Sequence, residues 1–162
     1  DLYNNWHDKI ISETGLPFKS LVKLNLGSNY LVGSIPSGIS RAFNLEDLTL
    51  SSNQLTGRIP DISELKKISQ LQLDGNQLTG KIPTKVSNLT KLTHLMLQNN
   101  KLTGTIPSEL GFLMHLKNLS LSFNKLEGSV PEGIGELKNL LLLHLHRNAL
   151  TGDIILWGNK CK

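Results

Sequence analysis

The sequence predicts an α/β fold in which short repeating units stack into a solenoid. Three observations support this prediction: an asparagine recurs at nearly constant spacing, a leucine-rich segment precedes each asparagine, and a leucine, a glycine and an isoleucine or valine follow at nearly fixed offsets. The asparagines are Asn29, Asn53, Asn76, Asn100, Asn124 and Asn148. Self-similarity at such a period is typical of repeat proteins, in which each unit buries its apolar side chains against its neighbours.

The first half of each unit predicts a short strand. The unit reads LxxLxLxxNxLxGx(I/V)P and begins at Leu21, Leu45, Ile68, Leu92, Leu116 and Leu140. Alternation around Leu-x-Leu indicates a strand with one buried face. The asparagine amide that ends the strand has two donors and one acceptor, so it can satisfy backbone groups of its own unit and of the neighbouring unit. We therefore expect an asparagine ladder at the six positions.

The second half of each unit predicts an irregular or 3₁₀ return path. Glycine suits a tight or closely packed backbone, and proline fixes φ and lacks a donor. Only the last copy lacks its proline. The second unit is one residue shorter than the others, and the missing residue lies between Pro60 and Ile68. A change in length there leaves the strand register intact, because loops tolerate it and strands do not.

The repeats define the expected domain organisation. Residues 21–155 form six repeats, residues 1–20 form an amino-terminal capping segment, and residues 156–162 form a carboxy-terminal cap fragment or a truncated end. The capping segment has apolar residues at helical spacing, which predict a short amphipathic helix over the first coil: Leu2, Trp6 and Ile10. No apolar run approaches the ~20 residues needed to span a bilayer, and no signal-peptide pattern occurs at the amino terminus as given. The single cysteine, Cys161, has no internal partner for a disulfide.

The six copies resemble the plant-type leucine-rich repeats of receptor kinases, receptor-like proteins and polygalacturonase inhibitors. The resemblance covers roughly residues 21–155. It implies a right-handed leucine-rich repeat solenoid, shaped as a horseshoe, with a concave parallel β-sheet and an irregular or 3₁₀ convex side. It also implies a second short β-segment near the LTGxIP part of the unit. Extracellular plant members usually carry paired cysteines in both caps, and this chain has no such pair.

The strand residues that point outward form a grid on the expected concave face. Its amino-terminal half is small and polar, whereas its carboxy-terminal half gathers Met, Phe, Leu, His and Arg, residue types that interface cores enrich or that are unusual on an exposed sheet. We therefore predict that a partner docks on the carboxy-terminal half, at His94, Met96, Asn118, Phe123, Leu142, His144, His146 and Arg147. The alternative is that Met96 and Phe123 only pack on neighbouring side chains and that Leu142 lies near a covered end.

Other chemistries are weakly supported. The histidines of the grid lack a nearby carboxylate and a convergent arrangement, so we expect no metal site there; a pH-sensitive contact fits them better. A net charge of +4 invites a nucleic-acid interpretation, but the basic residues do not gather with aromatic residues on the grid. We find no catalytic or cofactor-binding motif, so we expect neither an enzyme nor a cofactor.

Two further motifs lie outside these predictions. Asn88-Leu-Thr90 and Asn118-Leu-Ser120 match glycosylation acceptors, and only Asn88 lies on the expected return side, away from the grid. Threonines recur at one position after the ladder asparagine and would lie in register along one flank, as on an ice-binding surface: Thr56, Thr79, Thr103 and Thr151. Val32 and Glu127 interrupt the column. We therefore do not predict ice binding.

The sequence supports a non-enzymatic module that recognises another protein or peptide, with carbohydrate also possible as a ligand. Such a module would be extracellular or on the secretory route. The alternative is a structural or accessory subunit of a larger protein assembly, lumenal in an organelle or bound in a complex. The missing cap cysteines and the apolar residues near the carboxy-terminal end favour that alternative.

Overall fold

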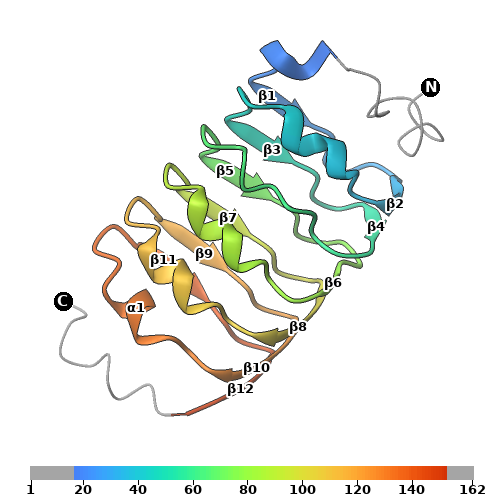
Figure 1. Ribbon diagram of the computed structural model, residues 1–162. Coiled ribbons are helices and arrows are strands. Elements are labelled where there is room, and N and C mark those ends of the chain that lie inside the picture. The colour runs from blue at the N-terminus through green and yellow to red at the C-terminus, as the bar shows by residue number, and fades with distance from the viewer. Residues whose placement is uncertain (1–16, 153–162) are drawn as a thin grey trace.

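The computed structural model describes residues 17–152 and arranges them as a stack of six coils (Figure 1). Each coil contributes one short strand to a six-stranded parallel sheet, and the strands follow one another in chain order. They are β1 (Lys23–Asn25), β3 (Asp47–Thr49), β5 (Gln70–Gln72), β7 (His94–Met96), β9 (Asn118–Ser120) and β11 (Leu142–His144). The α/β leucine-rich repeat solenoid predicted from the sequence is therefore confirmed.

A second row of short parallel strands follows the ladder asparagines. It comprises β2 (Val32–Ser34), β4 (Gln54–Thr56), β6 (Thr79–Gly80), β8 (Lys101–Thr105), β10 (Lys125–Ser129) and β12 (Ala149–Thr151). β2 pairs with β4, and β6, β8, β10 and β12 form a separate four-stranded sheet. These strands lie at the second β-segment that the family resemblance implied.

Short helices precede β1 and lie on the return path of the first, third, fourth and fifth coils. They are η1 (Pro17–Ser20), η2 (Ser37–Arg41), η3 (Thr84–Asn88), η4 (Ser108–Phe112) and α1 (Glu132–Gly135). From η2 onward each begins directly after the repeat proline, whose φ lies between −61° and −65°. Proline suits this place because a residue before the first turn needs no donor to a preceding carbonyl.

The repeat leucines fill the space between the sheet and the return path. The central leucines of the inner strands are almost completely buried, and so are the leucines two residues later. Partly buried leucines of the core belong mainly to the first and sixth coils. Burying a leucine side chain contributes about 1.5–3 kcal/mol, so repetition of the unit supplies most of the stabilisation of the stack.

The ladder asparagines join consecutive coils. The Oδ1 atom of Asn100 accepts a hydrogen bond from the Leu78 N–H at 2.9 Å, and its Nδ2 donates to the carbonyls of Leu73 and Leu97 at 3.0 and 3.1 Å. Equivalent bonds are made by Asn53, Asn76, Asn124 and Asn148. Among the described residues, Asn29 in the first coil donates to carbonyls of its own coil. These bonds satisfy buried backbone groups that no strand partner reaches.

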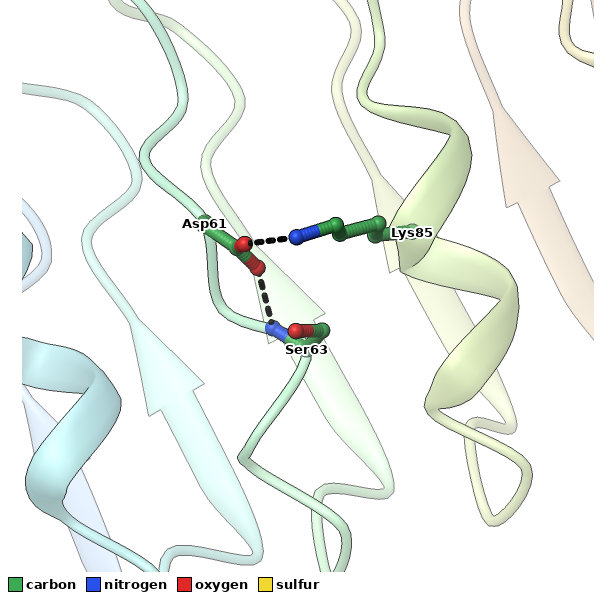
Figure 2. Close-up of polar contacts among 3 residues, drawn as sticks. All are labelled: Asp61, Ser63 and Lys85. Carbon is green, nitrogen blue, oxygen red and sulfur yellow. Dashed lines mark hydrogen bonds and ion pairs between the residues drawn. The ribbon is translucent and has the colours of Figure 1, made fainter.

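The second coil differs from the others on the return path. Its shortened tail forms turns where the first, third, fourth and fifth coils have a helix, and Asp61 there accepts a hydrogen bond from the Ser63 N–H at 3.0 Å. Figure 2 shows that Lys85, from η3 of the next coil, reaches back to the Asp61 carboxylate at 2.6 Å. The hydrogen bond from Lys85 is the main reason why the pKa of Asp61 lies well below its ordinary value. The missing residue is thus accommodated in the tail, as the repeat spacing predicts.

The two rows of strands stack with different registers. Partners in the first sheet occupy the same position of the repeat, as Lys23 and Asp47 do. In the second row Lys125 pairs with Thr103, although the residue equivalent to Lys125 in the preceding coil is Lys101. The same repeat position therefore shifts by two residues, roughly 7 Å, along the strand from one coil to the next. Glycine permits this stacking: Gly104 has a φ of +75°, and a Cβ atom there would lie 3.0 Å from the Lys81 side chain.

Some expectations concern residues 1–16 and 153–162, which lie outside the described residues. They include the amphipathic helix of the capping segment, the carboxy-terminal fragment after residue 155 and the role of Cys161. The division into 1–20, 21–155 and 156–162 therefore stays a prediction.

Candidate functional site

The predicted docking residues lie on or beside three neighbouring strands of the first sheet. We call the outward surface of this sheet the sheet face. His94 and Met96 belong to β7, Asn118 belongs to β9, and Leu142 and His144 belong to β11. Phe123, His146 and Arg147 lie in the turns that follow β9 and β11. The parallel register aligns His94 with Asn118 and Leu142, and it aligns Met96 with Ser120 and His144. The eight residues therefore share one region, which we call the carboxy-terminal patch.

Two small residues of the patch region, Ser120 and Ser122, lie between larger ones. Ser120 is only 1% exposed and Ser122 only 3%, although both occupy grid positions expected to face solvent. Met96 and His144 are the register partners of Ser120 on either side. Large side chains beside a serine on a sheet can reach over it, because facing positions in adjacent strands are only about 5 Å apart. The expectation that these outward positions are open to solvent is wrong for Ser120 and Ser122.

Two polar atoms beneath this surface make no hydrogen bond to any described residue. They are the Oγ atom of Ser120 and the Oε1 atom of Gln98, and both are shielded from solvent. A buried polar atom without a partner costs about 1–3 kcal/mol, and such atoms are uncommon enough in folded proteins to require an explanation. Among the described residues, these are the only shielded side-chain oxygens or nitrogens of this kind, and both belong to the carboxy-terminal half of the sheet face.

The residue before each ladder asparagine adopts the left-handed backbone region. The φ values lie between 54° and 65° in all six coils. The first four coils place small or turn-forming residues there, namely Ser28, Ser52, Gly75 and Asn99, whereas the last two place Phe123 and Arg147. Glycine and asparagine adopt this conformation most readily, and for a bulky residue it is an outlier. The fifth and sixth coils therefore carry side chains that the local backbone disfavours.

The aromatic and imidazole rings of the patch contact one another. The ring of Phe123, whose residue is 47% exposed, meets the ring of His146 edge to face at a centroid distance of 5.2 Å. His146 meets His144 in a similar way at 5.7 Å. Such aromatic pairs are stabilised by contact of a ring edge with a ring face. Part of the alternative expectation is thus correct, because Phe123 does pack on a neighbour, yet nearly half of the residue stays open to solvent.

Charge is distributed unevenly along the sheet face. Its acidic residues belong to the second and third coils: Glu46, Asp47 and Asp74. Asp47 and Asp74 accept hydrogen bonds from Thr49 and Ser51. From β7 to the turn after β11, the described sheet face carries Lys117, Arg147 and the histidines but no carboxylate. Across residues 17–152, no group of three or more His, Cys, Asp or Glu side chains is placed to hold a metal ion.

The threonines of the second row do not form a ladder. Thr56 pairs with Ser34 and Thr151 pairs with Ser129, so each lies beside the residue that follows the glycine of the preceding coil. Thr79 is likewise bridged to Arg58. The expectation that the threonines stand in register on one flank is wrong, because the two-residue shift between coils separates equivalent positions. In Thr79 the hydroxyl donates to the Gly57 carbonyl at 3.2 Å, which engages it within the fold.

The repeats match a known family. Five segments correspond to the family described as Leucine Rich Repeat, and together they cover most of the chain: residues 20–42, 44–64, 67–89, 91–113 and 115–137. The chain belongs to the leucine-rich repeat family. The five matches include the strands β1, β3, β5, β7 and β9 and most of the return path. A comparison with curated proteins gives no match.

Solved structures extend this relationship to plant receptors. The plant peptide hormone receptor RGFR1, in complex with RGF2, is 42% identical over 78% of this chain, with a TM-score of 0.75. This leucine-rich repeat chain covers 20% of that receptor chain, so it spans about a fifth of its length. The ectodomain of the receptor kinase SOBIR1 from Arabidopsis thaliana is 37% identical over 80% of this chain and 72% of its own, with a TM-score of 0.76.

A relative with a different activity shares the same fold. A plant ice-binding protein is 36% identical over 81% of this chain and 43% of its own, with a TM-score of 0.77. In this leucine-rich repeat chain the threonines of the second row are staggered and interrupted.

No helix in the described part of the chain combines the length and the apolar character needed to cross a bilayer.

Proposed function

We propose that this chain is a non-enzymatic recognition module that binds another protein or peptide through the carboxy-terminal patch of its sheet face. The proposal includes an extracellular or secretory-route location. Two relatives support its class: RGFR1 is described in complex with RGF2, and the Arabidopsis receptor kinase HAESA ectodomain in complex with a peptide hormone ligand. The HAESA chain is 35% identical over 82% of this chain, with a TM-score of 0.77.

One observation carries the choice of surface. Phe123 and Arg147 occupy the left-handed position that the other coils give to serine, glycine or asparagine. A strained backbone conformation of this kind costs on the order of 1–3 kcal/mol and tends to occur where function requires it. Phe123 remains 47% exposed, so packing within the fold offsets only part of the free-energy cost of this backbone conformation. Burial of the ring by a partner would offset the rest.

The surrounding patch has the composition of an interface core. Met96, Phe123 and Leu142 supply apolar area, and Arg147 supplies a planar charged group suited to carboxylates. The absence of carboxylates from this half of the described sheet face favours a partner segment that is acidic or ends in a carboxylate. The hydroxyl of Ser120 and the amide oxygen of Gln98 could gain hydrogen bonds if the partner moves the side chains that cover them.

The test compares proteins recovered on immobilised chain variants. The test variant combines Met96→Ala with Phe123→Ala, and the matched control is Phe43→Ala, because Phe43 is 50% exposed but lies outside the patch. We expect at least one extracellular protein or peptide to be retained by wild type and by the control and to be lost by the double variant. Truncation of interface anchors typically costs 2 kcal/mol or more each, roughly a 30-fold loss of affinity.

The control for folding is the circular dichroism spectrum and the thermal midpoint of each variant. Equal recovery of every partner by wild type and by a folded double variant would reject the carboxy-terminal patch as the docking surface. Direct titration of the recovered partner against the single variants would then show which of the two side chains is the anchor.

A further inference from the structure

We propose that Asn88 carries an N-linked glycan and that the exposed ring of Phe112 in the next coil is the platform on which its first sugar rests. The inference rests on the proposed extracellular function, because only a chain on the secretory route meets the lipid-linked sugar donor. It assigns a role to the return path that is separate from docking on the sheet face.

The acceptor group at Asn88 is free. Asn88 is exposed at the end of η3, and Thr90, the hydroxyl residue of the acceptor motif, is exposed two residues later. The structure gives the Asn88 amide no hydrogen-bond partner among the described residues. Other asparagines of the return path differ, since the amide group of Asn44 donates to the Lys19 carbonyl of η1 and that of Asn139 to the Met114 carbonyl of the preceding coil. Glycosylation of the Asn88 nitrogen would therefore break no hydrogen bond to a described residue.

Phe112 has the same position in its coil as Asn88 has in the preceding coil. Asn88 ends η3, Phe112 ends η4, and the two 3₁₀ helices have the same length and pack against each other. Figure 1 shows them as the green and yellow helical turns of adjacent coils. The residues after them, Leu89 and Leu113, have nearly the same backbone angles and equivalent hydrogen bonds, so Asn88 and Phe112 occupy equivalent backbone positions in adjacent coils.

The exposure of Phe112 then has an explanation. At 71% it is more exposed than Tyr30, Phe43 or Phe123. Single exposed apolar residues are common, but this one lies one coil away from the acceptor in the same position of the helix. The apolar face of a pyranose ring can lie flat on a phenylalanine ring and remove both from water.

The modification is an ordinary group transfer. The Nδ2 atom of Asn88 attacks the anomeric carbon of a sugar carried on a lipid diphosphate, and the bond between that carbon and the diphosphate oxygen breaks. The lipid diphosphate leaves with the bonding electron pair, and the amide nitrogen loses one proton to a base of the transferring enzyme. No oxidant or reductant is needed, and the transferase and the lipid-linked donor belong to the secretory route.

The second acceptor motif separates this inference from the docking proposal. Asn118 lies on β9 and is half-buried between β7 and β11. A glycan there would stand on the carboxy-terminal patch and obstruct docking, whereas a glycan on Asn88 would leave the sheet face open. Occupancy at Asn118 would therefore count against the docking proposal and would leave the assignment of Asn88 intact.

The first experiment measures site occupancy. The chain is secreted from eukaryotic cells behind an added leader, treated with a peptide N-glycosidase, and its peptides are analysed by mass spectrometry. We expect conversion of Asn88 to aspartate in wild type and in Asn118→Gln, and loss of the glycan in Asn88→Gln and in Thr90→Ala. Secreted wild type without sugar on Asn88 would overturn the proposal.

The second experiment tests the platform with a double-mutant cycle. Removing the glycan by Thr90→Ala should lower the thermal midpoint by about 2–4 °C when Phe112 is present, and the decrease should be largely absent in Phe112→Ser. The matched control is Phe43→Ser, in which the full decrease should remain because Phe43 is exposed in the first coil, whereas Asn88 lies in the third. An equal decrease with and without Phe112 would reject the platform.

Discussion

The asparagine ladder offers the sharpest test of how the coils are held together, through the substitution Asn100→Ala. Asn100 is 8% exposed and lies in the middle of the stack. Alanine would remove the acceptor of the Leu78 N–H, a bond of 2.9 Å, and both donors to the carbonyls of Leu73 and Leu97. Asn29→Ala is the matched control, because Asn29 is exposed and its side-chain hydrogen bonds to described residues lie within its own coil.

The loss of stability in Asn100→Ala should arise mainly from the Leu78 N–H, which loses its acceptor. The carbonyl of Leu73 also accepts from Asn76, and the carbonyl of Leu97 also accepts from Asn124, so both keep a partner in the variant. The Leu78 N–H keeps none and lies in a residue that is fully buried. An unsatisfied buried donor costs about 1–3 kcal/mol, and each lost bond to a carbonyl that keeps another partner adds about 0.5–1 kcal/mol. We therefore expect Asn100→Ala to lower the free energy of unfolding by about 2–4 kcal/mol.

The assay is urea unfolding followed by circular dichroism, with the slope of the transition checked for each variant. Water can replace the bonds of exposed Asn29, so Asn29→Ala should lower the free energy of unfolding by no more than about 0.5–1 kcal/mol. A difference between the two variants below about 0.5 kcal/mol would refute the idea that the ladder is a principal link between coils. A shallower slope for Asn100→Ala would indicate that the coils no longer unfold together.

Three further predictions concern packing, charge and strain. Gly111→Ala should destabilise the chain by about 1–3 kcal/mol in the same assay, because the new Cβ atom would lie 2.9 Å from the Gly133 backbone. Lys85 lowers the pKa of Asp61, so the ion pair should stabilise the fold at pH values above the ordinary aspartate pKa near 4. This stabilisation should be lost as the pH falls through the lower folded-state pKa of Asp61. The difference in stability between wild type and Lys85→Met should therefore vanish in acid, and it should shrink when salt is added. Phe123→Gly should keep or raise the thermal midpoint, because glycine accepts the left-handed φ of 54°, yet it should lose the partner; a lowered midpoint would show that Phe123 is a packing residue.

The sequence was sufficient for the coil and for the first sheet. The spacing between successive asparagines equals the offset between strand partners, so aligning Asn53 with Asn76 also aligns Asp47 with Gln70. The spacing also predicts the shortened tail before Ile68, because only the return path can lose a residue without turning strand side chains to the other face. Both inferences depend on periodicity alone, which a sequence displays directly.

The parts that could not be predicted depend on three-dimensional neighbours. The second row of strands has the same sequence period as the first, yet its coils are displaced by two residues, as Thr56 and Ser34 show. The burial of Ser120 depends on side chains of the neighbouring strands, in which Met96 and His144 are its register partners. The left-handed conformation of Phe123 contradicts residue propensity, so a propensity rule would have placed it elsewhere.

The distribution of these exceptions bears on where the function lies. In a solenoid each coil contacts only its neighbours, so a substitution on the surface of one coil changes stability locally and leaves the distant coils unaffected. The sheet face can therefore depart from the repeat pattern in one region at a bounded cost. The departures are the bulky residues Phe123 and Arg147 in the left-handed position and the unbonded oxygens of Gln98 and Ser120. All four belong to the fourth to sixth coils, whereas the sheet face of the first three coils shows neither kind of departure. Local rules are usually broken at functional sites. The carboxy-terminal patch is therefore the surface at which we expect recognition.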